Sequence, residues 1–168
     1  MIDDIDRQII LLLQEDAHLS NAALAEKVGL TASTVHERVR KLEKKGVIKG
    51  YVAVVNAEAV GKPIMAFIRL TVGITPEGYV ETKRSVLEAC RTEPDVLECH
   101  GVAGEDCYIL KVRTASPKEL ERLIEKIRSK ATVSSSVTSI VLSTFKESSP
   151  IVPCSHDSAE DNHLIGIY

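Results

Sequence analysis

A short basic segment stands out in a chain that is acidic overall. The 168 residues carry a formal net charge of −3, yet residues 33 to 49 hold six basic residues against two acidic ones, a local charge of +4. Arginine and lysine are the side chains that neutralise phosphates and recognise guanine edges. The distribution of charge, rather than its total, therefore predicts contact with nucleic acid.

The same segment predicts a helix whose basic side faces outward. Val35, Val39 and Leu42 recur at the spacing of one apolar face, and at about 3.6 residues per turn the opposite face carries short hydroxyl side chains first and basic ones later. Arg38 falls nearer the edge of the core. Ser33, Thr34, His36 and Arg40 are the residues expected at base edges of a major groove, and the lysines are expected at phosphates. The whole expected DNA-binding set is Ser33, Thr34, His36, Glu37, Arg38, Arg40, Lys41, Lys44, Lys45 and Lys49.

The preceding residues complete a helix-turn-helix. An apolar stripe over residues 2–13 predicts a first helix. Ser20 can cap a second, short helix, Gly29 supplies the turn that ends it, and either Thr31 or Ser33 caps the third. A generic three-helix bundle, or a solvated charged face without a ligand, is the alternative. Such a bundle gives no reason for a basic outer face on its third helix.

The second part of the chain alternates strands and helices. A β-rich stretch follows the third helix, and Gly61 and Pro63 mark a boundary after a hinge at residues 51–63. Beyond it the patterns predict strands at 64–72, 96–102, 107–112 and 133–145, with helices that open at Pro76 and Pro117. This βαββαβ order is that of a ferredoxin-like antiparallel sheet with helices on one face. We expect the bare face to be covered by a second copy, as suits a protein that reads two DNA half-sites.

Composition and cysteine spacing exclude several other classes. No apolar run exceeds five residues, and the N-terminus is acidic, so we expect neither a membrane span nor a secretory signal, and a cytoplasmic protein. The four cysteines form no C-x-x-C pair. Cys99 and His100 are adjacent on a strand and point to opposite faces, so buried thiols are expected rather than metal ligands. Residues 148–168 are interpreted as a flexible or loosely docked extension.

The order of these parts resembles the Lrp/AsnC, or feast/famine, family of transcriptional regulators over residues 1 to 147. The motifs that carry the resemblance are Ile5-Asp6-Arg7-Gln8-Ile9, Ser20-Asn21-Ala22-Ala23-Leu24-Ala25, Val28-Gly29-Leu30-Thr31, Glu37 to Glu43, Gly46 to Tyr51, and Glu98 to Lys111. The resemblance implies an α+β protein: a (winged) helix-turn-helix domain at 1–50, a hinge strand within 51–63, a ferredoxin-like effector-sensing domain (RAM, or αβ-sandwich) at 64–147, and an extension at 148–168. It also implies a sequence-specific regulator of amino-acid metabolism or transport genes that assembles as dimers and octamers.

The family resemblance further implies an amino-acid effector, and no other cofactor, bound between dimers at the turn after the second strand of the domain. The residues expected there are Val102, Gly104, Glu105, Asp106, Cys107 and Tyr108 from one subunit, with Ser134, Ser136 and Thr138 from a neighbour. A glycine turn exposes backbone N–H groups that can hold a carboxylate, and a nearby carboxylate can hold an ammonium group. The chain departs from the family at Cys107, where an aspartate is common, which leaves the effector's identity open. An ordinary hairpin turn is the alternative.

Two other functions are compatible with this order of elements. Some proteins of the same fold pair are tetrapyrrole decarboxylases, but such an enzyme needs basic and histidine residues around a large pocket, and His100 has no evident partners here. No catalytic motif is found in the sequence, so we expect no enzyme. An architectural DNA-binding protein without an effector is the remaining alternative.

Overall fold

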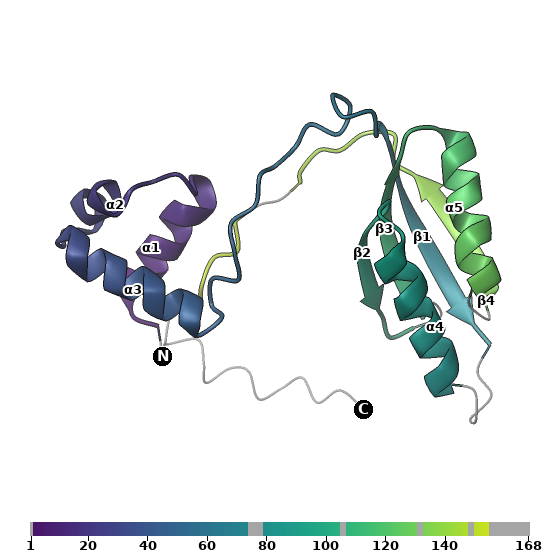
Figure 1. Cartoon of the computed structure of the whole chain (residues 1–168), viewed down its shortest axis with the longest axis horizontal. Helices are drawn as coiled ribbons and strands as arrows, with labels where there is room; N and C mark the ends of the chain where they lie inside the picture. The colour runs from purple at the N-terminus through teal and green to yellow at the C-terminus, as the bar shows by residue number, and fades with distance from the viewer. Residues whose placement is uncertain (1, 74–78, 105–106, 131–132, 148–149, 155–168) are drawn as a thin grey trace. The chain divides into compact units, whose positions relative to one another are not determined.

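The protein folds into two compact units (Figure 1). The structure is a computed structural model that describes residues 2–73, 79–104, 107–130, 133–147 and 150–154. The helical unit comprises residues 1–53 and 146–168, and the sheet unit comprises Val54–Phe145. Their elements are, in chain order, α1 (Asp4–Glu15), α2 (Asn21–Val28), α3 (Ala32–Lys44), β1 (Ile64–Val72), α4 (Tyr79–Thr92), β2 (Val96–Gly101), β3 (Tyr108–Thr114), α5 (Pro117–Lys130) and β4 (Val133–Ile140).

Local side-chain chemistry fixes both ends of the short helix α2. The Ser20 hydroxyl accepts a hydrogen bond from the backbone N–H of Ala23 at 3.2 Å, which satisfies one of the free donors at the helix start. Gly29 ends the helix at φ +69°, a left-handed conformation that glycine adopts without steric cost. Both predicted boundaries of α2 are confirmed.

The core of the helical unit is small. Its fully buried apolar side chains are Ile9, Leu24, Ala25, Val35 and Leu42, and partly buried aliphatic residues from all three helices surround them. The inward stripe expected for α3 is therefore confirmed, with Val39 half-buried beside it. This packing leaves the opposite side of α3 in solvent.

The sheet unit is the expected ferredoxin-like fold. Its four antiparallel strands stand in the order β2-β3-β1-β4, and α4 and α5 cover one face of the sheet (Figure 1). Twelve buried residues form one core, in which alternate strand residues such as Ile68 and Leu110 meet Val86 of α4 and Ile127 of α5. The α+β fold class is confirmed.

The uncovered face of the sheet is more polar than we expected. The strand register places Arg69 and Lys111 on it beside Phe67 and Val137. The two apolar side chains are 39% and 45% exposed. The face is thus a mixture of charged and apolar side chains rather than a bare apolar surface.

Two expected strand boundaries differ from the structure. The last strand ends at Ile140, five residues before the expected end at Phe145. Its partner β1 begins at Ile64, directly after Pro63, and the final bond on this edge runs from the Val141 N–H to the Met65 carbonyl, so later residues have no strand to pair with. The expected hinge strand is not formed either: residues 51–56 have no regular secondary structure.

The chain returns to the helical unit after β4. The Gln14 side chain at the end of α1 donates its amide N–H to the carbonyl of Ile151 at 2.9 Å and accepts the backbone N–H of Ile151 at 2.8 Å. One side-chain amide thereby replaces the pair of bonds that a neighbouring strand would supply. This part of the C-terminal extension is consequently docked at one defined point.

No helix in the described part of the chain is long and apolar enough to cross a membrane. The same residues contain no group of three or more histidine, cysteine and acidic side chains placed to hold a metal ion.

Candidate functional site

The helix α3 begins at a small cluster of hydroxyl groups. The Thr31 hydroxyl caps the helix by accepting the N–H of Thr34 at 3.3 Å, which decides between the two expected caps. It also lies 2.8 Å from the Thr34 hydroxyl and 3.0 Å from that of Ser33. The N-terminal turn, whose free N–H groups favour anions, therefore presents hydroxyl groups that can both donate and accept.

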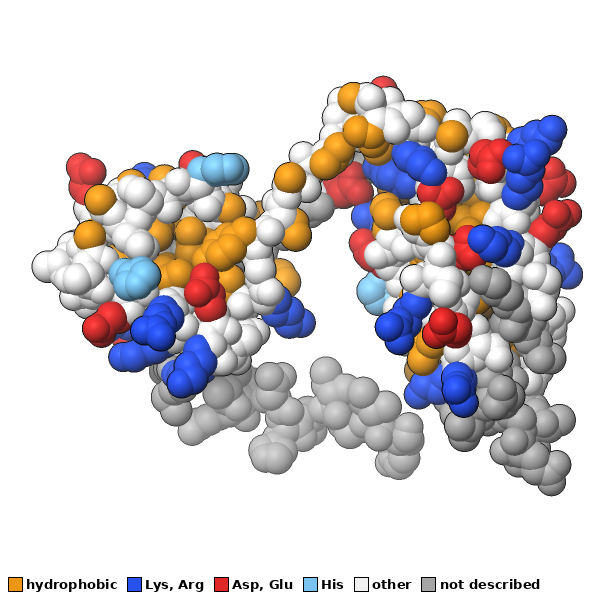
Figure 2. Space-filling model, in the orientation of Figure 1, with side chains coloured by type: hydrophobic (Ala, Val, Ile, Leu, Met, Phe, Trp, Pro, Cys, Tyr) orange, Lys and Arg blue, Asp and Glu red, His pale blue; other side chains and the backbone are white. Residues whose placement is uncertain are grey.

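Every residue of the expected DNA-binding set except Arg38 is exposed: Ser33, Thr34, His36, Glu37, Arg40, Lys41, Lys44, Lys45 and Lys49. Figure 2 shows the lysine and arginine side chains gathered along α3. The Nδ1 atom of His36 lies 3.2 Å from the side-chain amide nitrogen of Asn21 in α2, so the imidazole is oriented by the preceding helix. Asn21 was not expected at the site; its position as the first residue of α2, facing α3 across the turn, is the signal that would have indicated it.

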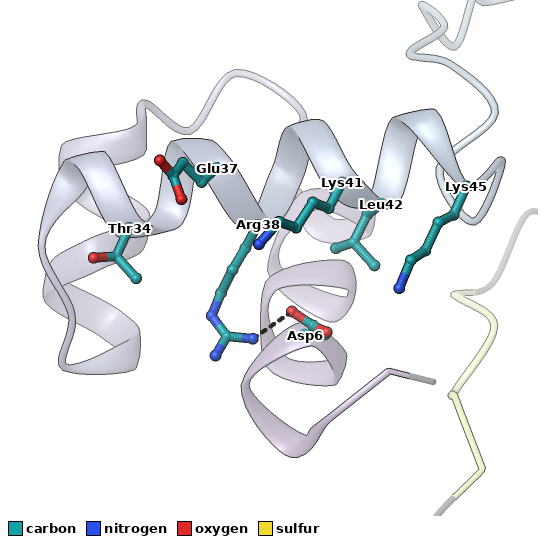
Figure 3. A pocket seen from close by; sticks show the side chains of 7 residues that line it. All are labelled: Asp6, Thr34, Glu37, Arg38, Lys41, Leu42 and Lys45. Carbon is teal, nitrogen blue, oxygen red and sulfur yellow. Dashed lines mark hydrogen bonds and ion pairs between the residues drawn. The ribbon is translucent and has the colours of Figure 1, made fainter.

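Arg38 is the exception, as its expected place near the edge of the core suggested. Its guanidinium donates to Asp3 Oδ2 at 2.6 Å and to Asp6 Oδ1 at 2.8 Å. Figure 3 shows the bond to Asp6. The two carboxylates hydrogen-bond to it and raise the pKa of Arg38. These contacts fix α3 against the start of α1.

The carboxylates that hold Arg38 also cap their own helix. The Asp3 side chain accepts the N–H of Asp6 at 2.8 Å, and the Asp6 side chain accepts the N–H of Asp3, a reciprocal capping box. The bond from the Asp6 backbone, followed by the bond from Arg38, lowers the pKa of the Asp3 carboxyl. Asp6 binds Arg38 only because α1 packs against α3, so the periodicity of the sequence could not predict this contact.

A shallow hollow runs along this side of α3. It has a volume of about 310 Å³, and Figure 3 shows its lining residues, Asp6, Thr34, Glu37, Arg38, Lys41, Leu42 and Lys45. Arg40, Lys41 and Lys44 line a second hollow of about 360 Å³ with Glu37. Basic side chains thus border open concave surfaces that a phosphate backbone can enter.

The far end of α3 is joined to the segment that follows it. The Tyr51 hydroxyl donates to Glu43 Oε1 at 3.0 Å. Burial, followed by this bond to a carboxylate, raises the pKa of Tyr51. One of the two acidic residues in the basic segment is thereby bound to a residue outside α3.

The expected effector turn joins β2 to β3. The Val102 N–H donates to the Cys107 carbonyl at 3.1 Å, and Gly104 has φ +138°, which favours glycine. Glu105 and Asp106, the carboxylates expected to hold an ammonium group, lie outside the described residues. Tyr108 is 7% exposed and packs in the core of the unit.

The expected partners on β4 lie at the same end of the sheet but on another strand. Tyr108 of β3 and Ser136 of β4 both pair with Leu70 of β1, which separates them within one chain. The Ser134 hydroxyl donates to the Thr71 carbonyl at 2.9 Å. Ser136 and Thr138 are half-buried. The fold therefore does not bring the two expected groups together in a single chain.

Comparison with known proteins assigns both units. Residues 2–49 match the family described as winged helix-turn-helix DNA-binding, and residues 66–151 match the Lrp/AsnC ligand binding domain. The HTH-type transcriptional regulator LrpA of Mycobacterium tuberculosis is 40% identical over 152 residues, which cover 90% of this chain and 97% of that protein. The HTH-type transcriptional regulator AldR of Mycolicibacterium smegmatis is 35% identical over 151 residues, covering 89% and 86%.

Solved structures agree with this assignment. A transcriptional regulator of Neisseria meningitidis in complex with L-Met superposes with a TM-score of 0.83 at 26% identity, over 90% of this chain and 96% of that one. A feast or famine regulatory protein of M. tuberculosis complexed with L-methionine gives a TM-score of 0.78 at 36% identity, over 91% and 100%. The relatives are named as regulators rather than enzymes, in agreement with our expectation. The chain therefore belongs to the Lrp/AsnC family of HTH-type transcriptional regulators.

Proposed function

We propose that this chain is a sequence-specific regulator of genes for amino-acid metabolism or transport, with α3 in the major groove of its operator. Residues 1–50 bind DNA, 51–63 act as the hinge, 64–147 bind the effector and form the oligomer, and 148–168 form an extension. The single observation that carries this proposal is the exposed basic face of α3 on a helix-turn-helix whose apolar seam is buried.

The contacts of α3 divide its basic residues into two roles. Within the described residues, Arg40, Lys41 and Lys44 form no ion pair, so their charges are available to DNA, whereas the Arg38 charge is satisfied by Asp3 and Asp6. Ser33, Thr34, His36 and Arg40 read base edges, and the lysines, Lys45 and Lys49 included, contact phosphates. Arg38 positions α3 rather than contacting DNA directly.

An amino acid is the effector that the turn between β2 and β3 fits best. Solved relatives contain L-methionine. The backbone around Gly104 can hold a carboxylate, and Asp106 or Glu105 can pair with the ammonium group. Because Ser134, Ser136 and Thr138 lie on another strand, a neighbouring subunit completes the site. Pairing through the uncovered sheet face gives a dimer, and dimers assemble further, up to an octamer.

DNA binding tests the groove assignment. Duplexes enriched by the wild-type protein from a random pool are titrated with the Arg40→Ala, Lys41→Ala double variant, and fluorescence anisotropy is measured at several salt concentrations. Loss of Arg40 from a base edge is expected to cost about 1–3 kcal/mol of binding free energy. Loss of the Lys41 phosphate contact is expected to reduce the slope of log affinity against log salt by about 0.9.

A Lys118→Ala variant is the matched control, since Lys118 is an exposed lysine on α5 of the sheet unit. It should bind like the wild type. Unchanged affinity in the double variant, with the oligomer intact, contradicts the groove assignment.

Thermal-shift measurements against the twenty amino acids test the effector site. A binding amino acid raises the melting temperature, and Asp106→Ala should abolish that shift while basal DNA binding is kept. A shift that survives Asp106→Ala places the effector elsewhere. If no amino acid alters either melting or DNA binding, the protein is an architectural DNA-binding protein.

A further inference from the structure

A side-chain hydrogen bond joins α2 to the first turns of α3 at the rim of their packing surface. The amide nitrogen of Asn21 lies 3.2 Å from Nδ1 of His36. Asn21 shares one face of α2 with Leu24 and Ala25, which are both buried. His36 directly follows Val35, which is fully buried in the same core. The bond therefore lies beside the side chains that hold the two helices together.

The chemistry of the two groups decides which nitrogen of the imidazole carries the proton. The side-chain amide nitrogen of asparagine only donates, so Nδ1 of His36 accepts its hydrogen. In a neutral imidazole the other nitrogen then carries the proton, and Nε2–H is a donor. A histidine without this contact would populate both tautomers, whereas the contact with Asn21 selects one.

The Nε2 atom of His36 is available to a ligand. The side chain is exposed, and no described residue of the chain makes a hydrogen bond to Nε2. Ser33 precedes His36 by about one helical turn and Arg40 follows it by another, and both are exposed. The donor thus belongs to the row of side chains that we assign to base edges.

We propose that Asn21 is a positioning residue that holds His36 as an Nε2–H donor, so that His36 selects guanine in the major groove. Guanine presents two adjacent acceptors there, N7 and O6. Cytosine presents an amino donor, adenine places an amino donor beside N7, and thymine places a methyl group beside its single acceptor. Asn21 acts through His36 and does not itself read a base. The base preference rests on the proposed function, and the tautomer does not.

NMR of the free full chain tests the tautomer. The nitrogen-15 chemical shifts of the two ring nitrogens are measured at about pH 8, where an ordinary histidine is neutral. In the wild type, Nε2 of His36 should be protonated and Nδ1 unprotonated. Asn21→Ala removes the donor and should give averaged shifts. Asn21→Asp replaces the donor with a carboxylate that only accepts, so Nδ1 should gain a proton.

Sequencing of the duplexes that each protein enriches from a random pool tests the base preference. The wild type should prefer a guanine at one position of each half-site, and both His36→Ala and Asn21→Ala should lose that preference. Reversing this base pair should weaken wild-type binding by about threefold to tenfold, the effect of one hydrogen bond, and Asn21→Ala binding much less. Glu26→Ala is the matched control on α2, since Glu26 is exposed and should leave every base preference unchanged.

Different outcomes overturn the two parts of the proposal. A protonated Nδ1 in the wild type, or the same averaged shifts as in Asn21→Ala, overturns the tautomer whatever the DNA result. Identical base preferences in the wild type and Asn21→Ala overturn the role in specificity. Equal loss of affinity for all sequences in His36→Ala places the imidazole at a phosphate and overturns base reading. If the wild type binds no duplex, the proposed function fails together with the base preference, while the NMR result stands. Circular dichroism confirms that the variants are folded.

Discussion

The two units of the chain hold their functional residues in different ways. The helical unit buries five apolar side chains and presents its expected binding residues on the outside of one helix, which ion pairs from Arg38 to Asp3 and Asp6 support. The sheet unit buries twelve residues in its core and carries its expected binding residues at a turn and on a strand at the opposite edge. A small core can support the proposed DNA-binding surface because that surface is a single helix. The proposed effector site, made from a turn, needs a second chain to complete it.

The largest expected effect comes from the cores themselves. Ile9 of the helical unit and Ile68 of the sheet unit are both fully buried, so truncation of either to alanine is expected to cost about 2–5 kcal/mol. Ile9→Ala should remove hydrogen-exchange protection from the helical unit and abolish DNA binding, because its core is small. Ile68→Ala should lower protection in the sheet unit only. If either variant reduced hydrogen-exchange protection equally in both units, the two units would unfold together, and they would not have the independent cores that the comparison assumes.

A smaller effect is expected from the ion pairs between α1 and α3. Arg38→Ala removes the charged hydrogen bonds to Asp3 and Asp6, and since the group is partly exposed the expected cost is about 1–2 kcal/mol in the stability of the helical unit. Arg40→Ala on the same helix is the matched variant: it should lower DNA affinity and leave thermal stability unchanged. Lower thermal stability in Arg40→Ala, or unchanged stability in Arg38→Ala, would contradict the assignment of a structural role to Arg38 and a DNA-binding role to Arg40.

The cap of α3 should give an effect of about 1 kcal/mol. Thr31→Ala removes the acceptor of the Thr34 N–H, so the first turn of the recognition helix should fray. Amide exchange at residues 33–36 measures this directly. Ser33→Ala is the control, because Ser33 lies within the helix and does not cap it. If Ser33→Ala frays the turn as much as Thr31→Ala, the hydroxyl cluster rather than the cap stabilises the helix.

The smallest expected effect is the pH dependence of the helical unit. The pKa of Asp3 is lowered in the folded state below its ordinary value of 3.8, so its contribution to stability is present above that value and is lost as the pH falls through the lower, folded pKa. Thermal unfolding from pH 5 down to pH 2 should show this loss in the wild type. Asp3→Asn should be less stable at pH 5 and lose less on acidification. A parallel pH profile for the two proteins would contradict the role of Asp3.

Prediction from the sequence was most successful where a residue acts on its own helix or strand. Ser20 and Gly29 mark the start and the end of α2, as expected. The apolar spacing of α3 correctly predicted its exposed face and the position of Arg38 near the edge of the core. These features depend on chain geometry within a few residues, which the sequence states directly.

Contacts between distant residues could not be predicted in the same way. The partners of Arg38 and the bond between Asn21 and His36 depend on how separate elements pack. The premature end of β4 has a similar cause, because its last pair, Ile140 with Ala66, lies close to the start of the neighbouring strand β1 at Ile64. The spacing of residues in the sequence predicts which helix face or strand face a side chain occupies, but it does not predict which distant residue that side chain contacts.

The docking of Ile151 on Gln14 has a mechanical consequence. The chain leaves the helical unit after residue 53 and is fastened to it again by these two hydrogen bonds, so the sheet unit is an insertion held by two tethers. Because the segments before and after the sheet unit both belong to the helical unit, the chain crosses between the two units twice, at residues 53–54 and 145–146.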